Sequence, residues 1–193
     1  MKRNFLLAAA CSLLVFAMTA AGQDKAVSFS GTWNLDVSKS KLGDRNNIES
    51  QVLTVTQTDK DIKIDVATKR AAPPADAAKG DRPGGGRMGG GGQGRGGFGG
   101  GDGTTTYSLD GKETKTDVSG PMGTMPVTLK AKIDGGKLKL SRNSTFNGPN
   151  GEVSISSKET WELSGDGKTL TVNVERTSPR GSESATKFFT RKS

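Results

Sequence analysis

Few side chains in this sequence could do chemistry. Histidine, the commonest general base and metal ligand, is absent from all 193 residues. The only cysteine, Cys11, lies inside an apolar N-terminal run. The carboxylates are scattered as Asp-Gly and Asp-Lys turn residues instead of converging as a pair of acid and base. We therefore expect a protein that is not an enzyme, with no metal site and no cofactor.

Polar residues at alternate positions of three apolar segments are the remaining candidates for a site. They are Arg142 and Ser144 after Leu140, Ser157 and Glu159 before Trp161, and Arg176 after Val172 and Val174. In a strand, alternate residues share one face, so these polar side chains share a face with apolar ones. We predict that Arg142 and Arg176 hold an anionic head group, because guanidinium groups pair well with carboxylates and phosphates. Trp161, Leu140 and Val172 would line the apolar depth of the same site.

The role of Glu159 leaves three interpretations open. One strand offset places Glu159 directly across from Arg142, where an ion pair would neutralise the arginine and serve structure, since an unpaired buried charge is costly. In the second interpretation, Arg142 and Arg176 are a handle for a ligand. In the third, this end opens to water and the charges are solvated.

The segments that carry these residues read as β-strands. From Ser30 onward, short runs rich in Thr, Val, Ile and Leu alternate with polar residues at period two, and no helical stripe is present. The expected strands span residues 31–37, 51–57, 61–68, 104–109, 112–118, 126–133, 137–146, 152–163, 169–176 and 184–191.

Glycine-containing turns link several of these strands. Asp110-Gly111, Asp134-Gly135-Gly136 and Gly165-Asp166-Gly167 are tight hairpin signals, in which glycine supplies the positive φ that such turns need. Neighbouring strands should therefore pair consecutively. We predict an all-β fold, an antiparallel up-and-down meander that closes into a lipocalin-like barrel of 8–10 strands and so removes its exposed edges.

The N-terminus is typical of a secretory signal. Lys2 and Arg3 precede an apolar run over residues 5–21 that ends in small residues. We expect residues 1–22 to be a signal peptide and residues 23–193 to be one exported barrel domain, periplasmic or secreted, with no transmembrane segment after cleavage. A membrane anchor is the alternative, but the run is a little short for a spanning helix. The protein without its signal would have no cysteine and thus no disulfide.

A Gly/Arg-rich insertion at about residues 70–103 interrupts the strand pattern. Fifteen of the 24 residues from Gly80 to Gly103 are glycine, with Arg82, Arg87, Arg95 and Phe98 among them. This composition cannot bury enough surface to fold, so it predicts a disordered, flexible loop inside the domain. Gly94-Arg95-Gly96 resembles the Arg-Gly-Gly boxes of RNA-binding tails, but export and thin charge density favour a spacer, and we expect no nucleic-acid partner.

The first expected strand resembles a known signature. Residues 29–35, Phe-Ser-Gly-Thr-Trp-Asn-Leu, resemble the Gly-x-Trp opening of the calycin superfamily, the lipocalins and fatty-acid-binding proteins, and also the start of small exported bacterial β proteins of uncharacterised function. The resemblance implies a barrel in which Trp33, near Gly31, closes one end and is covered by Arg191 from the last strand. Ten strands favour the fatty-acid-binding branch, but residues 38–50 are too few for its pair of helices, and lipocalins have eight strands.

Two functions from different classes follow. The first is an exported carrier or sensor of a small lipophilic molecule, with an anionic head group as an open option. The second is a non-enzymatic, envelope-associated interaction protein with a packed barrel and a Gly/Arg-rich contact loop. They differ in the cavity they require, since small-molecule sites occupy roughly 300 Å³ or more. We expect a monomer in either case.

Overall fold

The computed structural model describes residues 27–43, 47–71, 102–120, 123–148 and 151–192. The predicted signal peptide at residues 1–22 lies outside the described residues, as do Arg82, Arg87, Arg95 and Phe98 of the predicted insertion. No helix in the described ranges is both long and apolar enough to cross a membrane.

Ten antiparallel strands in one sheet make up the fold, and the described part of the chain contains no helix, which confirms the predicted all-β, up-and-down architecture. The strands are β1 (Gly31–Leu35), β2 (Ile48–Gln57), β3 (Asp61–Arg70), β4 (Gly103–Ser108), β5 (Glu113–Gly120), β6 (Gly123–Asp134), β7 (Lys137–Gly148), β8 (Gly151–Leu163), β9 (Thr169–Ser178) and β10 (Gly181–Arg191). All ten predicted strands are present. The main difference at the N-terminal end is that β1 stops at Leu35, two residues before the predicted end at Val37.

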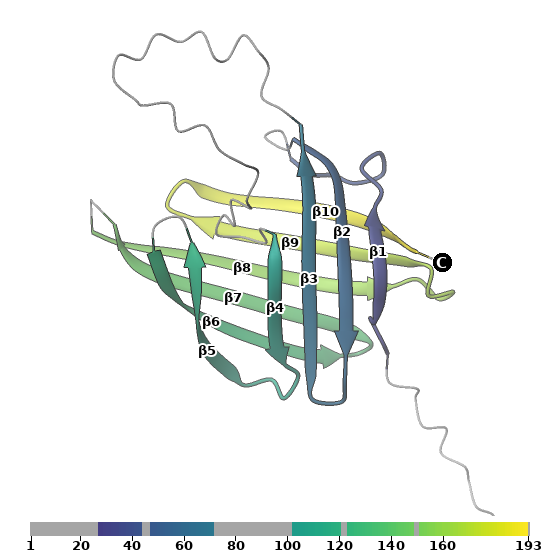
Figure 1. Ribbon diagram of the computed structural model, residues 1–193, viewed down its shortest axis with the longest axis horizontal. Helices are drawn as coiled ribbons and strands as arrows, with labels where there is room; N and C mark the ends of the chain where they lie inside the picture. Colours follow the sequence, from purple (N-terminus) through teal and green to yellow (C-terminus); the bar gives the residue numbers. More distant parts are fainter. Residues whose placement is uncertain (1–26, 44–46, 72–101, 121–122, 149–150, 193) are drawn as a thin grey trace, which may run out of the picture.

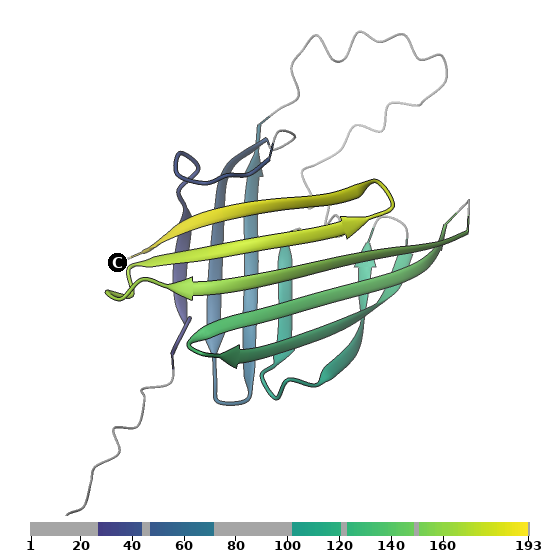
Figure 2. The ribbon, with the colours of Figure 1, turned by 180° about the vertical axis from the view of Figure 1, so that it is seen from behind.

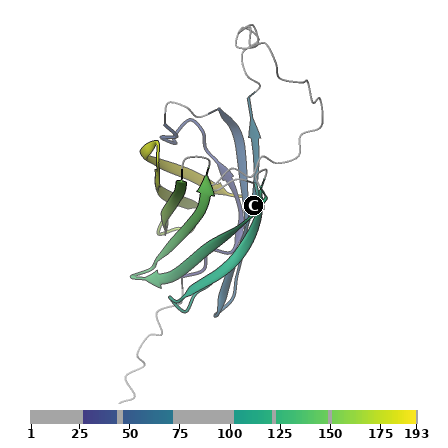
Figure 3. The ribbon, with the colours of Figure 1, turned by 90° about the vertical axis from the view of Figure 1, so that its left-hand side faces the viewer.

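The sheet folds over itself to form a nearly closed barrel. Strands β1 to β4 form one layer and β6 to β10 the other, and the strands of the two layers cross steeply (Figures 1 and 2). The side view in Figure 3 shows the two layers facing each other. Such steep crossing is one of the two standard ways in which sheets pack, and it leaves the inner faces of both layers to build one core.

Strands β1 and β10 join the two layers on one side. Trp33 is the register partner of both Leu53 on β2 and Arg191 on β10. The Arg191 guanidinium lies over the Trp33 ring, 4.3 Å from its centroid, and donates hydrogen bonds to the carbonyls of Ser30 (2.9 Å) and Gly167 (3.0 Å). Trp33 is fully buried, and its indole N–H donates to the carbonyl of Phe29 (3.0 Å). The arrangement is the one that the Gly-x-Trp resemblance implies.

On the opposite side, closure is incomplete. The sheet order β4-β3-β2-β1-β10-β9-β8-β7-β6-β5 puts β4 and β5 at its two edges, although they are consecutive in the chain. The predicted hairpin at Asp110-Gly111 was therefore wrong. The Leu109 N–H donates to Lys60 before β3 (2.7 Å), and the Gly111 N–H donates to Ala131 on β6 (3.1 Å), so the two sides of this turn are bound to different neighbours.

Apolar side chains fill the end of the barrel that holds Trp33. Phe29, Trp33, Leu138, Leu170 and Phe189 are nearly or completely buried in one cluster. Phe29 meets Trp161 edge to face, with ring centroids 6.3 Å apart. Aromatic pairs of this geometry contribute about 0.5–1.5 kcal/mol beyond the area they bury. We call this apolar cluster the floor of the barrel.

The Trp33–Arg191 contact makes Gly31 a sensitive position. Its φ of +139° disfavours any side chain, and a Cβ there would lie 2.8 Å from Nη1 of Arg191. We predict that Gly31→Ala lowers the free energy of unfolding by about 1–3 kcal/mol, measured by urea denaturation. Gly165→Ala is the matched control, because a Cβ at Gly165 meets nothing within 4 Å and needs no positive φ. Equal stabilities of the two variants would contradict this account of the contact.

Candidate functional site

The predicted register is confirmed for β6 with β7 and for β8 with β9. Ala131 pairs with Leu140 and Leu129 with Arg142, while Trp161 pairs with Val172 and Glu159 with Val174. Directly paired residues point to the same face of an antiparallel sheet. The polar residues of these strands therefore share the inner face with the floor, and two of them, Ser144 and Ser157, are buried.

Four of the six predicted ligand-binding residues line one small cavity inside the barrel. The cavity measures about 60 Å³ and is bounded by Leu140, Arg142, Glu159 and Trp161 together with Ile64, Val66, Thr105, Tyr107, Ser141 and Ser157. Val172, predicted to line the depth, instead packs in the core and does not border this cavity. Arg176 lines a different hollow of about 130 Å³, next to Ser178, Arg180, Gly181 and Glu183 at the turn between β9 and β10.

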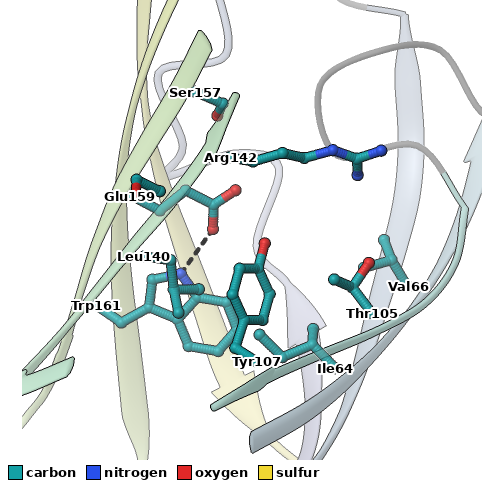
Figure 4. Close-up of a pocket in the computed structure, with 10 residues that line it drawn as sticks. Ile64, Val66, Thr105, Tyr107, Leu140, Arg142, Ser157, Glu159 and Trp161 are labelled. Atoms are coloured by element: carbon teal, nitrogen blue, oxygen red, sulfur yellow. Dashed lines mark hydrogen bonds between the residues drawn. The ribbon is translucent and has the colours of Figure 1, made fainter. Parts of the chain in front are cut away.

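The predicted offset that placed Glu159 across from Arg142 was wrong. Glu159 pairs with Leu140, and Arg142 pairs with Ser157. The Glu159 carboxylate accepts a hydrogen bond from the Trp161 indole N–H (2.8 Å), which aims it at the floor. Figure 4 shows the Arg142 side chain extending away from Glu159, toward Val66 and Thr105. Among the described residues, neither Arg142 nor Arg176 makes an ion pair.

Three inward polar residues escaped the sequence analysis: Tyr107, Gln51 and Lys187. Gln51 and Lys187 each stand two residues from a buried apolar residue on the same strand, Leu53 and Phe189, so the alternation that found Arg142 could have found them. Tyr107 has only the half-buried Thr105 at that spacing on β4. Lys187 Nζ donates to Gln51 Oε1 (3.1 Å), and Gln51 Nε2 donates to Thr68 Oγ1 (2.9 Å). Burial lowers the pKa of Lys187, Glu159 acts in the opposite direction, and Arg70 lowers the pKa further.

Tyr107 brings a buried hydroxyl to the cavity. The Tyr107 hydroxyl points away from the floor, to the side of the cavity where the Glu159 and Arg142 side chains lie (Figure 4). Burial raises the pKa of this phenol well above its ordinary value, the Glu159 carboxylate raises it further, and Arg142 lowers it. The phenol therefore stays neutral and can donate or accept a hydrogen bond at physiological pH.

A second, larger hollow adjoins the cavity where the barrel fails to close. This seam cleft measures about 460 Å³ and lies between β4 and β5. It is lined by Asp61, Thr104, Thr105, Thr106, Ser108, Thr114, Lys115, Thr116, Asp117, Leu129 and Arg142. The lining includes Thr105 from the inner face of β4 and its neighbours Thr104 and Thr106 from the outer face. Thr105 and Arg142 border both hollows, so the cleft adjoins the interior cavity at these two residues.

In the described part of the chain, no group of three or more Asp, Glu, Cys or His side chains is arranged to hold a metal ion. Comparison of the sequence with protein-family models and with curated proteins finds no match.

The chain's single tyrosine allows the electrostatics of the cavity to be measured directly. We predict that the tyrosinate absorbance of the folded protein appears only well above pH 10. Glu159→Gln should lower the titration midpoint, and Arg142→Met should raise it, because these charges act on Tyr107 in opposite directions. Since the pKa is raised on folding, Tyr107 supports the fold fully below its unfolded pKa, near 10.0, and this support is lost as the pH rises toward the folded value. An unshifted midpoint in both variants would contradict the placement of these charges beside Tyr107.

Proposed function

We propose that this protein is an exported, non-enzymatic binding protein for a small amphipathic molecule with an anionic group, and that Arg142 is the residue that contacts this group. The single observation that carries the proposal is a half-buried guanidinium inside the barrel that makes no ion pair in the described structure, although Glu159 borders the same cavity. A charge removed from water is costly unless it is paired, and an anionic ligand would supply the partner.

The polar groups around Arg142 suit an anionic head group. Ser157, directly opposite Arg142 on β8, is buried, and the hydroxyls of Tyr107 and Thr105 border the same cavity. Charge-assisted hydrogen bonds from a guanidinium, with neutral hydroxyls beside it, are a common way to bind carboxylate or phosphate oxygens. Glu159 repels such a group less than it otherwise would, because its carboxylate is hydrogen-bonded to Trp161 and aimed at the floor.

The volumes decide how much of a ligand the interior can take. The cavity of about 60 Å³ is far below the 300 Å³ or more of ordinary small-molecule sites, so only a head group fits there. The seam cleft of about 460 Å³ has room for the remainder, and Arg142 borders both hollows. A second candidate function is an envelope-associated interaction protein with a packed barrel. The filled floor favours it, because such a protein needs no large cavity.

We also propose that the protein is exported and that it is distantly related to the calycin superfamily. The basic and apolar N-terminus supports secretion to the periplasm or beyond. The Gly31, Trp33 and Arg191 arrangement supports a distant relation to the calycin superfamily, whose barrels commonly carry small ligands.

A matched pair of ligands tests the role of Arg142. We predict that the protein binds dodecanoate more tightly than dodecanol, and that Arg142→Met weakens dodecanoate binding about tenfold or more while leaving dodecanol unchanged. The measurement is the change in fluorescence of Trp161, which borders the cavity, against the background of the second tryptophan, Trp33, in the floor.

Arg176→Met serves as the control for net charge, because Arg176 lines the separate hollow at the β9–β10 turn. It should leave the affinity for dodecanoate within about twofold of that of the unaltered protein. Equal losses in both variants would point to a general effect of positive charge, and no loss in either would end the proposal for Arg142.

A further inference from the structure

The edge of β4 lacks the features that usually protect an unpaired strand. Its sequence, Gly-Thr-Thr-Thr-Tyr-Ser, contains no charge and no proline, and its pairing with β3 runs without a bulge. Thr and Tyr are residues with high β-propensity. Natural proteins normally blunt such edges with lysine, proline or bulges, or cover them. By contrast, β5 on the other side of the cleft carries Glu113, Lys115 and Asp117.

The main chain of β4 offers alternate hydrogen-bonding groups to the seam cleft. Leu109 donates to Lys60, in register with the β3–β4 ladder, so Tyr107 and Thr105 also occupy the hydrogen-bonded positions opposite β3. Antiparallel ladders alternate, so the N–H and C=O groups of the residues between them face the other way, into the cleft. These residues are Thr104, Thr106 and Ser108, and β4 pairs with no described strand other than β3.

The form of the cleft restricts what can pair with this edge. Strands of the same barrel bound it on both sides, and its lining includes Arg142 from the inner face of β7. The β4 edge of a second copy would bring its own β3 with it and meet β5, whereas a single extended segment brings no second strand into the cleft. The inner end of the cleft presents Leu129 and the guanidinium of Arg142, which favours apolar and acidic side chains on the inward face of that segment.

We infer that the seam cleft binds an extended peptide, which adds to the barrel as a strand along β4 and turns an acidic side chain inward to Arg142. Strand addition of this kind takes its affinity from main-chain hydrogen bonds and its specificity from alternate side chains. The inference rests on the proposed function in one respect, that an anionic group contacts Arg142, and it names the chemical class of the rest of the ligand.

The test uses the full chain and a capped peptide, acetyl-Thr-Val-Thr-Glu-Thr-Val-Thr-amide, whose Val and Glu side chains share one face. Thr106→Pro removes a main-chain donor that faces the cleft, while the ladder to β3 keeps its hydrogen bonds. The expected result is saturable binding in calorimetry that Thr106→Pro weakens about tenfold or more. Thr106→Val, which keeps the N–H and removes only an exposed hydroxyl, should remain within about twofold of the unaltered protein.

Four outcomes would overturn the inference: no binding of the peptide up to about 1 mM, equal binding by Thr106→Pro, undiminished binding of a peptide N-methylated at alternate residues, or self-association of the protein that Thr106→Pro abolishes. Failure of the peptide inference can be distinguished from failure of the proposed function. If Thr106→Pro keeps normal dodecanoate binding while the peptide fails to bind, only the peptide is excluded. If Arg142→Met leaves the binding of both probes unchanged, the anion contact itself is excluded.

Discussion

The contact between Arg191 and Trp33 is the constraint from which the rest of the structure follows. It ties the last strand of the chain, β10, to the first, β1, and the guanidinium is held by two main-chain carbonyls as well as by the indole ring. Gly31 leaves the space that the guanidinium occupies. With Trp33 immobilised, Phe29 and Phe189 pack around it, and the floor is built from large side chains that need no polar partner beyond the indole hydrogen bond.

Because the floor is filled with apolar side chains, the inward-facing charged side chains lie at the other end of the barrel interior. Arg142, Glu159 and Lys187 all face inward, but each has a different environment. The indole N–H of Trp161 binds Glu159, and the amide of Gln51 binds Lys187, whereas Arg142 extends toward the seam without an ion pair in the described structure. The interior is therefore polar and largely filled, and the Arg142 cation is directed toward its opening. This geometry differs from that of a barrel with a wide apolar cavity.

The sequence predicted local features, such as strands and turns, well. It predicted poorly which strands pair with each other and in which register. Period-two alternation located all ten strands, and the glycine turns at Asp134 and Asp166 set the register that placed Arg142 and Glu159 inside. Asp110-Gly111 carries the same turn chemistry, yet its strands separate, because Gly111 binds to β6 and Leu109 to the β3 side. The offset between β7 and β8 also failed. Residues 147–151 contain two Asn-Gly pairs, which leave the position of the turn ambiguous, and the strands pair as far as Gly148 and Gly151, so that Ser157 opposes Arg142.

The incomplete closure explains how a packed barrel can still have a site. The interior cavity beside this floor measures about 60 Å³, too little for most ligands. Separation of β4 from β5 adds a cleft that Arg142 borders and leaves main-chain groups of β4 without a partner among the described strands. The turn at Asp110, which does not form the predicted hairpin, and the guanidinium of Arg142, which makes no ion pair among the described residues, are then parts of one arrangement. Because the turn binds to β6 and not to a hairpin partner, the wall stays open at the place toward which the cation points.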